Sequence, residues 1–270
     1  MLLEILRPIL FLGVLSLALG LLLGLASKIF FVAKDEKVVA LRGILPGVNC
    51  GACGLAGCDV FASDVAKGAA KITGCPVGGA ALVAEIAEIM GIEAEQAEKT
   101  AAFVRCGGNH NLAKNNYEYV GTIDCNAAAI LANGGPKGCF YGCMGLGTCA
   151  AACPYDAIEM QDGLAVIIPD KCVSCALCVA ACPKDLIEIL PLSKTLRVAC
   201  NSHDTGRITR TVCSVGCIAC KICQKSCPAD AILFSDNLAK IDYEKCTLCG
   251  ICAEKCPTKA ICNLQASGKI

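Results

Sequence analysis

The residues in this sequence that are best suited to chemistry are its cysteines. The chain has 25 cysteines among 270 residues, and many of them stand with two residues between them in runs of the form C-x2-C-x2-C. Thiolates at this spacing hold metal ions or iron–sulfur clusters more often than they form disulfides. Because metal-binding thiols must stay reduced, we expect this part of the chain to lie in the cytoplasm.

Three runs match the bacterial ferredoxin pattern C-x2-C-x2-C-x3-C-P in full. They are CVSCALCVAACP from Cys172, CIACKICQKSCP from Cys217 and CTLCGICAEKCP from Cys246. In this pattern three cysteines on one loop hold one four-iron cluster, and the fourth, which enters a short helix, ligates the neighbouring cluster. The proline that follows has no N–H, so it turns the chain without offering a competing donor. Three complete runs indicate [4Fe–4S] clusters rather than zinc.

The second half of the chain contains a repeat of 74 residues. Six cysteines recur at this offset: Cys149, Cys153, Cys172, Cys175, Cys178 and Cys182 recur as Cys223, Cys227, Cys246, Cys249, Cys252 and Cys256. Each copy predicts a ferredoxin-like domain with two clusters and two small hairpins, the first at residues 121–195 and the second at residues 196–270. The sequence DCNAA at Cys125 is similar to ACNSH at Cys200, which predicts an N-terminal strand ending in Cys-Asn in each copy.

A different cysteine pattern precedes the repeat. The segment VNCGACGLAGC and the later Cys75 give the spacing C-x2-C-x4-C-x16-C, with glycines that let backbone amides approach sulfur. Four cysteines could also bind zinc, and the runs downstream favour a cluster. We expect a small helical four-cysteine domain at residues 34–92. Two amphipathic helices, about Ala80–Met90 and Glu93–Val104, lead into a helical linker predicted at residues 93–120.

Motif spacing divides twenty cysteines into five predicted cluster sites, in which four thiolates bind the iron. Site 1 contains Cys50, Cys53, Cys58 and Cys75; site 2 contains Cys153, Cys172, Cys175 and Cys178; site 4 contains Cys217, Cys220, Cys223 and Cys256; site 5 contains Cys227, Cys246, Cys249 and Cys252. Site 3 departs from the pattern, because Leu146 stands where the other copy has Cys220. We predict that site 3 contains Cys139, Cys143, Cys149 and Cys182. The expected cofactors are five [4Fe–4S] clusters, and we assign no catalytic residue.

Five cysteines remain outside these sites: Cys106, Cys125, Cys200, Cys213 and Cys262. The repeat makes Cys213 the counterpart of Cys139, so it could ligate in place of Cys220, although the complete run favours Cys220. All of the five except Cys262 could instead hold a sixth cluster, but they come from distant segments. We expect the five to be buried free thiols, so that Cys213→Ser leaves the iron content unchanged.

The first 33 residues predict a membrane anchor. The run ILFLGVLSLALGLLLGLA, Ile9–Ala26, has no charge, and with the residues after it a helix of about 27–36 Å could cross a bilayer. A cleaved signal peptide would need a shorter apolar region and a small-residue cleavage site. Basic residues stand at positions 28, 34, 37 and 42 after the run, and at position 7 before it. We therefore expect residues 1–33 to form a single-pass anchor, with the cluster domains on the cytoplasmic side of the cell (inner) membrane.

These segments together predict an α+β protein with one N-terminal transmembrane helix, a small helical four-iron cluster domain and two bacterial two-cluster ferredoxin-like domains. The sequence has no basic run of the kind that indicates nucleic-acid binding. It also has no G-x-G-x-x-G loop at a strand–helix junction and no recognisable nucleophile with a base. We therefore expect the chain to relay electrons rather than to transform a substrate.

The chain resembles the B subunits of Rnf complexes, which are membrane-bound ferredoxin:NAD oxidoreductases. The resemblance covers nearly the whole chain and includes the anchor, the NCGACGLAGC segment, RCGG at residues 105–108, the GCFYGCMGLGTC run and the two ferredoxin patterns. It implies an electron-transfer subunit that accepts electrons from reduced soluble ferredoxin. These electrons would pass toward NAD through other membrane and peripheral subunits, while sodium ions or protons cross the membrane.

Two other functions are compatible with the same motifs. A membrane-tethered polyferredoxin could serve another oxidoreductase, such as a hydrogenase, and a structural interaction module could use the four-cysteine sites for zinc. Iron and acid-labile sulfide analysis separates clusters from zinc. The subunits that purify with the chain separate the two electron-transfer functions.

Overall fold

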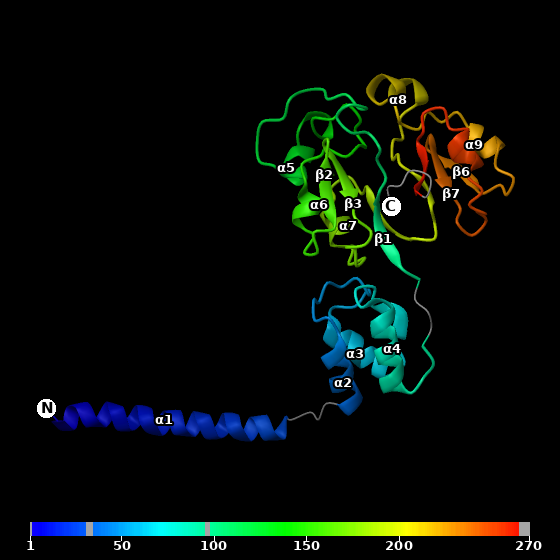
Figure 1. Ribbon diagram of the computed structural model, residues 1–270. Helices are drawn as coiled ribbons and strands as arrows, with labels where there is room; N and C mark the ends of the chain where they lie inside the picture. Colours follow the sequence, from blue (N-terminus) through cyan, green and yellow to red (C-terminus); the bar gives the residue numbers. More distant parts are fainter. Residues whose placement is uncertain (1, 31–34, 95–97, 265–270) are drawn as a thin grey trace.

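The structure is a computed structural model that describes residues 2–30, 35–94 and 98–264. The helices are α1 (Leu2–Ile29), α2 (Glu36–Ile44), α3 (Cys58–Ala66), α4 (Gly79–Met90), α5 (Cys125–Ala129), α6 (Thr148–Ala151), α7 (Leu177–Ala181), α8 (Gly206–Val212), α9 (Ile222–Lys225) and α10 (Ile251–Glu254), with short 3-10 helices η1 (Ile72–Gly74) and η2 (Ala132–Gly134). The strands are β1 (Thr100–Val104), β2 (Ile158–Gln161), β3 (Leu164–Ile167), β4 (Ile187–Pro191), β5 (Leu196–Val198), β6 (Ile232–Ser235), β7 (Leu238–Ile241) and β8 (Ile261–Asn263). Figure 1 shows α1 standing alone, then a helical domain, then two ferredoxin-like domains.

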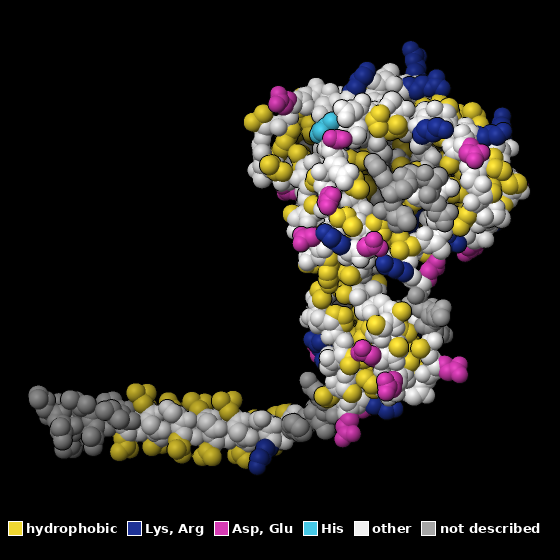
Figure 2. Space-filling model, viewed as in Figure 1, with side chains coloured by type: hydrophobic (Ala, Val, Ile, Leu, Met, Phe, Trp, Pro, Cys, Tyr) yellow, Lys and Arg dark blue, Asp and Glu magenta, His cyan; other side chains and the backbone are white. Residues whose placement is uncertain are grey.

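Helix α1 extends away from the rest of the chain (Figure 1). Its segment Leu10–Ile29 has 20 residues and a mean hydropathy of 2.3, and none of it is buried against other parts of the chain. Hydrophobic side chains cover this segment in Figure 2. Within the part of the chain that the structure describes, it is the one helix long and apolar enough to cross a membrane. An exposed apolar surface of this size is compatible with a membrane anchor.

Helices α2, α3 and α4 form a small domain around an aliphatic core. Its most deeply buried side chains include Leu41, Phe61, Val65 and Ile86. The Asp35 carboxylate begins α2 by accepting the N–H of Lys37 at 2.9 Å, and Gly91, in the left-handed conformation, ends α4. At the start of α3, the side-chain oxygen of Asn49 accepts the N–H of Cys58 at 2.8 Å. The aliphatic core thus supports site 1 from one side.

The segment after the helical domain differs from the sequence prediction. A helix forms close to the predicted range Ala80–Met90, as α4, whereas the range Glu93–Val104 ends in strand β1. Residues 95–97 of the predicted helical linker lie outside the described residues, and its described part, residues 98–120, contains no helix. The sequence TAAFV includes β-branched and aromatic side chains, and its pairing with β4 fixes the extended conformation.

Each ferredoxin-like domain consists of two antiparallel strand pairs and short helices. In the first domain β1 pairs with β4 and β2 with β3, and in the second β5 pairs with β8 and β6 with β7. The β2–β3 and β6–β7 turns contain Asp162-Gly163 and Asp236-Asn237, all with positive φ, as two-residue hairpins require. The predicted α+β fold class is confirmed.

Strand β1 belongs to the first ferredoxin-like domain, so the domain begins near residue 100 and not at residue 121. Cys106 lies two residues after β1, and Cys200 lies two residues after the equivalent strand β5. These two cysteines are therefore structural counterparts, whereas Cys125 begins helix α5 instead of ending a strand. Cys106 and Cys200 are 94 residues apart, against 74 for the motif cysteines, so the first domain has 20 additional residues between Cys106 and Cys139.

Backbone hydrogen bonds join the two ferredoxin-like domains. They run from the N–H of Gly107 to the carbonyl of Ala199 at 2.9 Å, from Lys114 to Val212 at 2.8 Å, and from Ser214 to Leu112 at 2.9 Å. The buried Arg197 adds a cation–π contact, with its guanidinium carbon 5.0 Å from the centroid of the Phe103 ring. These contacts bring the segment after β1 against the segment after β5.

Candidate iron–sulfur sites

Among the described residues, two of the hollows that four cysteines line coincide with sites predicted from spacing. The site 2 hollow has an empty volume of about 330 Å³ and contains Cys153, Cys172, Cys175 and Cys178. The site 4 hollow has an empty volume of about 340 Å³ and contains Cys217, Cys220, Cys223 and Cys256. The structure thus brings together both predicted sets, including the fourth cysteine that each takes from a distant motif. That these thiols bind iron remains a prediction.

Sites 1 and 5 are groups of neighbouring thiols. Burial raises the pKa of Cys75, and the nearby thiols of Cys58 and Cys53 raise it further. Cys50 lies on the same loop as Cys53, and the side chain of Tyr155 has both Cys50 and Cys75 near it. In site 5, burial raises the pKa of Cys252 to about 11 with a further contribution from the thiols of Cys246, Cys249 and Cys227.

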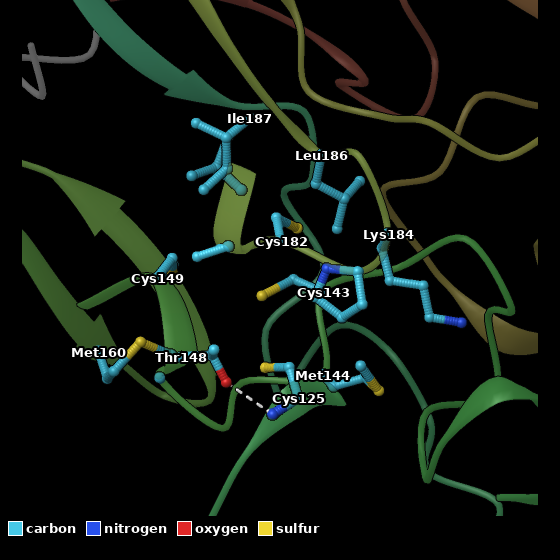
Figure 3. A pocket seen from close by; sticks show the side chains of 15 residues that line it. Cys125, Cys143, Met144, Thr148, Cys149, Met160, Cys182, Lys184, Leu186 and Ile187 are labelled. Atoms are coloured by element: carbon cyan, nitrogen blue, oxygen red, sulfur yellow. Dashed lines mark hydrogen bonds between the residues drawn. The ribbon is translucent and has the colours of Figure 1, made fainter. Parts of the chain in front are cut away.

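The hollow at site 3 differs by one cysteine from the set predicted for this site. Its hollow, with an empty volume of about 390 Å³, is lined by Cys125, Cys143, Cys149 and Cys182. Figure 3 shows these four side chains around one space, with Met144 and Met160 beside them. Burial raises the pKa of Cys149 to about 12, and the nearby thiols of Cys143, Cys125 and Cys182 contribute to this rise. The structure does not bring Cys139 to this hollow.

The position of Cys125 follows from the start of helix α5. Asp124 is the N-cap of α5, and its carboxylate accepts the N–H of Asn126 at 3.0 Å and the hydroxyl of Thr148 at 2.8 Å. The Thr148 hydroxyl in turn accepts the N–H of Cys125 at 2.6 Å, the dashed line in Figure 3. These hydrogen bonds lower the pKa of Asp124. They tie Cys125 to helix α6, which contains Cys149.

Cys139 lies instead in a fourth hollow, which we call the interdomain hollow. Its cysteines are Cys106, Cys139, Cys200 and Cys213, and its empty volume is about 360 Å³. Two of these cysteines come from the first ferredoxin-like domain and two from the second. Cys143 lines site 3, so the C-x3-C segment from Cys139 to Cys143 directs its two thiols to different hollows.

The motif loops share one backbone conformation around the middle position of each C-x2-C-x2-C run. The residues on both sides of this position have positive φ, and they are Ser174 and Ala176 in site 2, Ala219 and Lys221 in site 4, and Leu248 and Gly250 in site 5. Gly145 and Gly147 repeat the conformation in site 3, although Leu146 stands between them. Alternating right- and left-handed residues turn successive N–H groups toward one point and so form an anion-binding concavity. The strain at non-glycine residues is consistent with a loop shaped for an anionic group.

Burial raises the pKa of several cysteines in these hollows. It raises the pKa of Cys149 and Cys200 to about 12, and that of Cys178 and Cys223 to about 11. Such thiols hold their protons at neutral pH unless a metal centre displaces them. In the described residues no three cysteine, histidine or acidic side chains are close enough to hold a single metal ion. The thiols surround an open space, which fits a four-iron cluster because a cluster is wider than one ion.

Sequence comparison with known families agrees with this arrangement. Residues 45–77, which contain site 1, match a family described as a putative Fe–S cluster. Residues 139–186 and 216–260 each match the 4Fe–4S dicluster domain. The fold and its cysteine sites therefore define an iron–sulfur protein with two ferredoxin-like dicluster domains.

Relatives that align with most of the chain identify the family. The B subunit of the Na(+)-translocating ferredoxin:NAD(+) oxidoreductase complex of Acetobacterium woodii is 48% identical over 247 residues, which are 91% of this chain and 74% of the relative. The B subunit of the ion-translocating oxidoreductase complex of Methanosarcina acetivorans is 42% identical over 86% of this chain and 88% of its own. The B subunit of the proton-translocating ferredoxin:NAD(+) oxidoreductase complex of Clostridium ljungdahlii is 43% identical over 86% and 82%. The chain belongs to the family of B subunits of ion-translocating (Rnf) oxidoreductase complexes.

Motif spacing did not place Cys125 beside Cys143, Cys149 and Cys182, and it did not group the four cysteines of the interdomain hollow. A usable signal for Cys125 was Leu146, which leaves the site 3 loop one thiol short. A signal for the interdomain hollow was the offset of 74 between Cys139 and Cys213, which places both at the same point of the repeat. The cysteine repeat could not locate Cys106, because the position of Cys106 follows from strand β1, which contains no cysteine.

Proposed function

We propose that this chain is the membrane-anchored electron-relay subunit of an ion-translocating ferredoxin:NAD oxidoreductase. In this function it accepts electrons from reduced soluble ferredoxin, passes them to partner membrane and peripheral subunits, and contributes no catalytic residue. The observation that carries the proposal is the succession of thiol sites through adjoining domains. Each [4Fe–4S] cluster, when bound, would take up and release one electron.

Neighbouring sites lie close to each other. Burial and the Cys153 thiol raise the pKa of Cys175 in site 2. Cys50 of site 1 is close enough to raise this pKa further. Sites 2 and 3 share the core of the first ferredoxin-like domain, which includes Cys178 and Cys149. Sites 4 and 5 share the core of the second domain in the same way. This succession supports a relay that begins in the second ferredoxin-like domain and ends in the helical domain.

The two ends of this succession differ in exposure. Cys220 of site 4 and Cys249 of site 5 are exposed to solvent. Site 1 lies in the helical domain, which follows α1 in the chain. We propose that α1 anchors the chain in the cell membrane, with the basic residues after it on the cytoplasmic side. Electrons would then enter at the exposed domain and move toward the membrane partners.

A basic surface beside site 4 suits a soluble ferredoxin. Residues 205–229 contain no Asp or Glu, and they contain the basic residues Arg207, Arg210, Lys221 and Lys225. All four basic side chains are exposed, and Figure 2 shows Lys and Arg gathered over α8 and α9. A ferredoxin carries clusters whose four thiolates make them anionic. Opposite charges would therefore steer its encounter with this surface.

Reversing two of these charges tests the docking surface. We expect Arg207→Glu with Arg210→Glu to slow reduction by ferredoxin about tenfold or more at low salt, because electrostatic steering is lost. The measurement is the stopped-flow rate of reduction at several ionic strengths. Lys71→Glu, an exposed position in the helical domain, is the matched control. Equal rates in the double variant and the wild type would contradict this docking surface.

The proposed function is tested on full-length protein purified anaerobically in detergent. We expect iron and acid-labile sulfide in equal amounts, little zinc, and bleaching of the visible cluster absorbance when reduced ferredoxin is added. Mostly zinc with little sulfide would contradict the relay. Isolation from membranes with hydrogenase subunits, and without flavin-bearing membrane partners, would favour a polyferredoxin of another oxidoreductase.

A further inference from the structure

We infer that the interdomain hollow binds a sixth [4Fe–4S] cluster, which connects the cluster sites of the two ferredoxin-like domains. The ligands would be Cys106, Cys139, Cys200 and Cys213. This inference rests on the proposed relay function and adds to it the step across the domain boundary. It reverses the sequence-based expectation that Cys213→Ser leaves the iron content unchanged.

The interdomain hollow has the size of the other cluster hollows. Its empty volume of about 360 Å³ lies between those of site 2, about 330 Å³, and site 3, about 390 Å³. Four cysteines line it, as in the other hollows. The four cysteines are far apart in the sequence, but the hydrogen bonds between the domains bring their segments together.

The four cysteines form two pairs of equivalent residues. Cys139 and Cys213 are related by the 74-residue repeat, and Cys106 and Cys200 each follow the first strand of their domain by two residues. Each domain therefore supplies the same two thiols. A site built from equivalent residues of two repeats at their contact surface is a feature of the fold rather than a chance meeting of thiols.

Backbone amides donate to these thiols, as expected around a cluster. The Cys200 thiol accepts the N–H of Cys217 at 3.2 Å and the N–H of Ser202 at 3.5 Å. The amides of Val215 and Gly216 donate to Cys213, and that of Tyr141 donates to Cys139. Hydrogen bonds to cysteine sulfur stabilise the thiolate that an iron–sulfur cluster requires.

Glycines keep the wall of the hollow thin. A Cβ at Gly108 would lie 3.2 Å from the sulfur of Cys213, and one at Gly142 would lie 3.4 Å from the Cβ of Cys139. The contact at Gly108 is tighter than ordinary packing, so a side chain there would press on the Cys213 thiol, whereas one at Gly142 would meet the Cβ of Cys139 and the side chain of Lys137. The absence of a side chain at Gly108 therefore leaves space beside the sulfurs of Cys213 and Cys106.

A buried lysine beside the hollow lacks an anionic partner among the described residues. Lys137 is 4% exposed, and its ammonium donates to the carbonyls of Gly108 and, at 2.7 Å, of Cys143. None of the ion pairs in the described residues includes it. An unpaired buried charge is costly. Anionic clusters in site 3 and the interdomain hollow, both of which lie next to Lys137, would compensate this charge.

A buried hydroxyl of the hollow is also without a partner. Thr209 is 1% exposed and lines the interdomain hollow, and its Oγ1 has no hydrogen-bond partner in the described residues. A buried hydroxyl without a hydrogen-bond partner destabilises the folded state, because it gives up its hydrogen bonds to water. A sulfide or thiolate sulfur of a bound cluster would provide the acceptor that the protein itself does not.

The hollow lies between site 3 and site 4. Burial is the main cause of the raised pKa of Cys143 in site 3, and the nearby Cys106 thiol raises this pKa further. On the other side, Cys200 receives the N–H of Cys217, a thiol of site 4. A cluster here would turn two separate pairs of sites into one continuous path.

Serine variants of the full-length protein, purified anaerobically in detergent, test the sixth cluster. We expect about 24 irons in the wild type and about 20 in Cys106→Ser/Cys213→Ser, with sulfide falling in parallel. Cys262→Ser is the matched control, because this half-buried thiol on β8 lies outside all six sites, and the variant should keep the wild-type iron content. We also expect reduced ferredoxin to reduce the clusters of sites 4 and 5 in the double variant at the wild-type rate, and those of sites 1 to 3 at least about tenfold more slowly.

The outcomes separate this inference from the proposed function. About 20 irons in both the wild type and the double variant, with ferredoxin reduction intact, would overturn the sixth cluster and leave the relay standing. Zinc in place of iron and sulfide in the wild type would overturn both. If the double variant folds poorly, Cys213→Ser alone gives the decision: unchanged iron contradicts the inference, and a loss of about four irons supports it.

Discussion

Removal of iron and sulfide from the purified protein is expected to unfold both ferredoxin-like domains and to leave the helical domain folded. The cores of the ferredoxin-like domains combine a few aliphatic side chains with cysteines of the cluster sites, and their strands have only three to five residues. Two-stranded pairs of this length are marginal by themselves in water. Small domains without a sufficient apolar core depend on bound metal for much of their folding free energy.

The helical domain has a different source of stability. Its buried core is aliphatic and aromatic, whereas Cys53, Cys58 and Cys75 are only partly buried at its edge. Hydrogen exchange followed by mass spectrometry, before and after anaerobic chelation, measures both parts in one chain. We expect amides of β2, β3, β6 and β7 to exchange fast after chelation, and amides of α3 and α4 to stay protected. Protection of the hairpins in the iron-free protein would contradict the dependence on clusters.

Replacement of Cys125 by serine is expected to remove about four irons, the content of one [4Fe–4S] cluster. The reason is the geometry of site 3, in which Cys125 faces Cys143, Cys149 and Cys182. The motif spacing alone predicts no loss, because it places Cys139 in this site and leaves Cys125 free. Iron and sulfide counts of the anaerobically purified variant therefore decide between the two ligand sets.

Double variants sharpen this comparison. Cys125→Ser/Cys139→Ser should lose about eight irons, because the two thiols belong to different hollows, whereas Cys139→Ser/Cys213→Ser should lose only about four. Cys262→Ser again provides the control. A Cys125→Ser protein with the iron content of the wild type would return Cys139 to site 3.

The parts of this molecule that the sequence predicted best are the ones that local spacing determines. The loops of sites 2, 4 and 5 place three thiols within seven residues, so their geometry follows from the chain itself. The fourth thiol of site 2 or site 4 also follows, because the repeat fixes which motif lies opposite. The prediction of α4 succeeded for a similar reason, since the stripe of Leu82, Ile86 and Ile89 has a helical period.

The parts that the sequence did not predict depend on contacts between distant segments. Strand β1 owes its conformation to β4, which lies more than 80 residues later, and its small side chains gave a weak helical pattern. Cys125 reaches site 3 through Asp124 and Thr148, a contact that no spacing rule contains. The interdomain hollow requires the packing of one domain on the other, which a repeat pattern cannot specify.

The pairing of equivalent cysteines across the domain boundary bears on how such a chain could arise. A single ferredoxin-like domain of this type has two of the four thiols of the interdomain hollow, which are too few to enclose a cluster. Duplication of the domain supplies the other two at once, provided that the copies pack through the same surface. An ancestral two-cluster module could therefore gain three clusters from one duplication. The cluster at the junction would let electrons pass between the two copies as soon as they were joined.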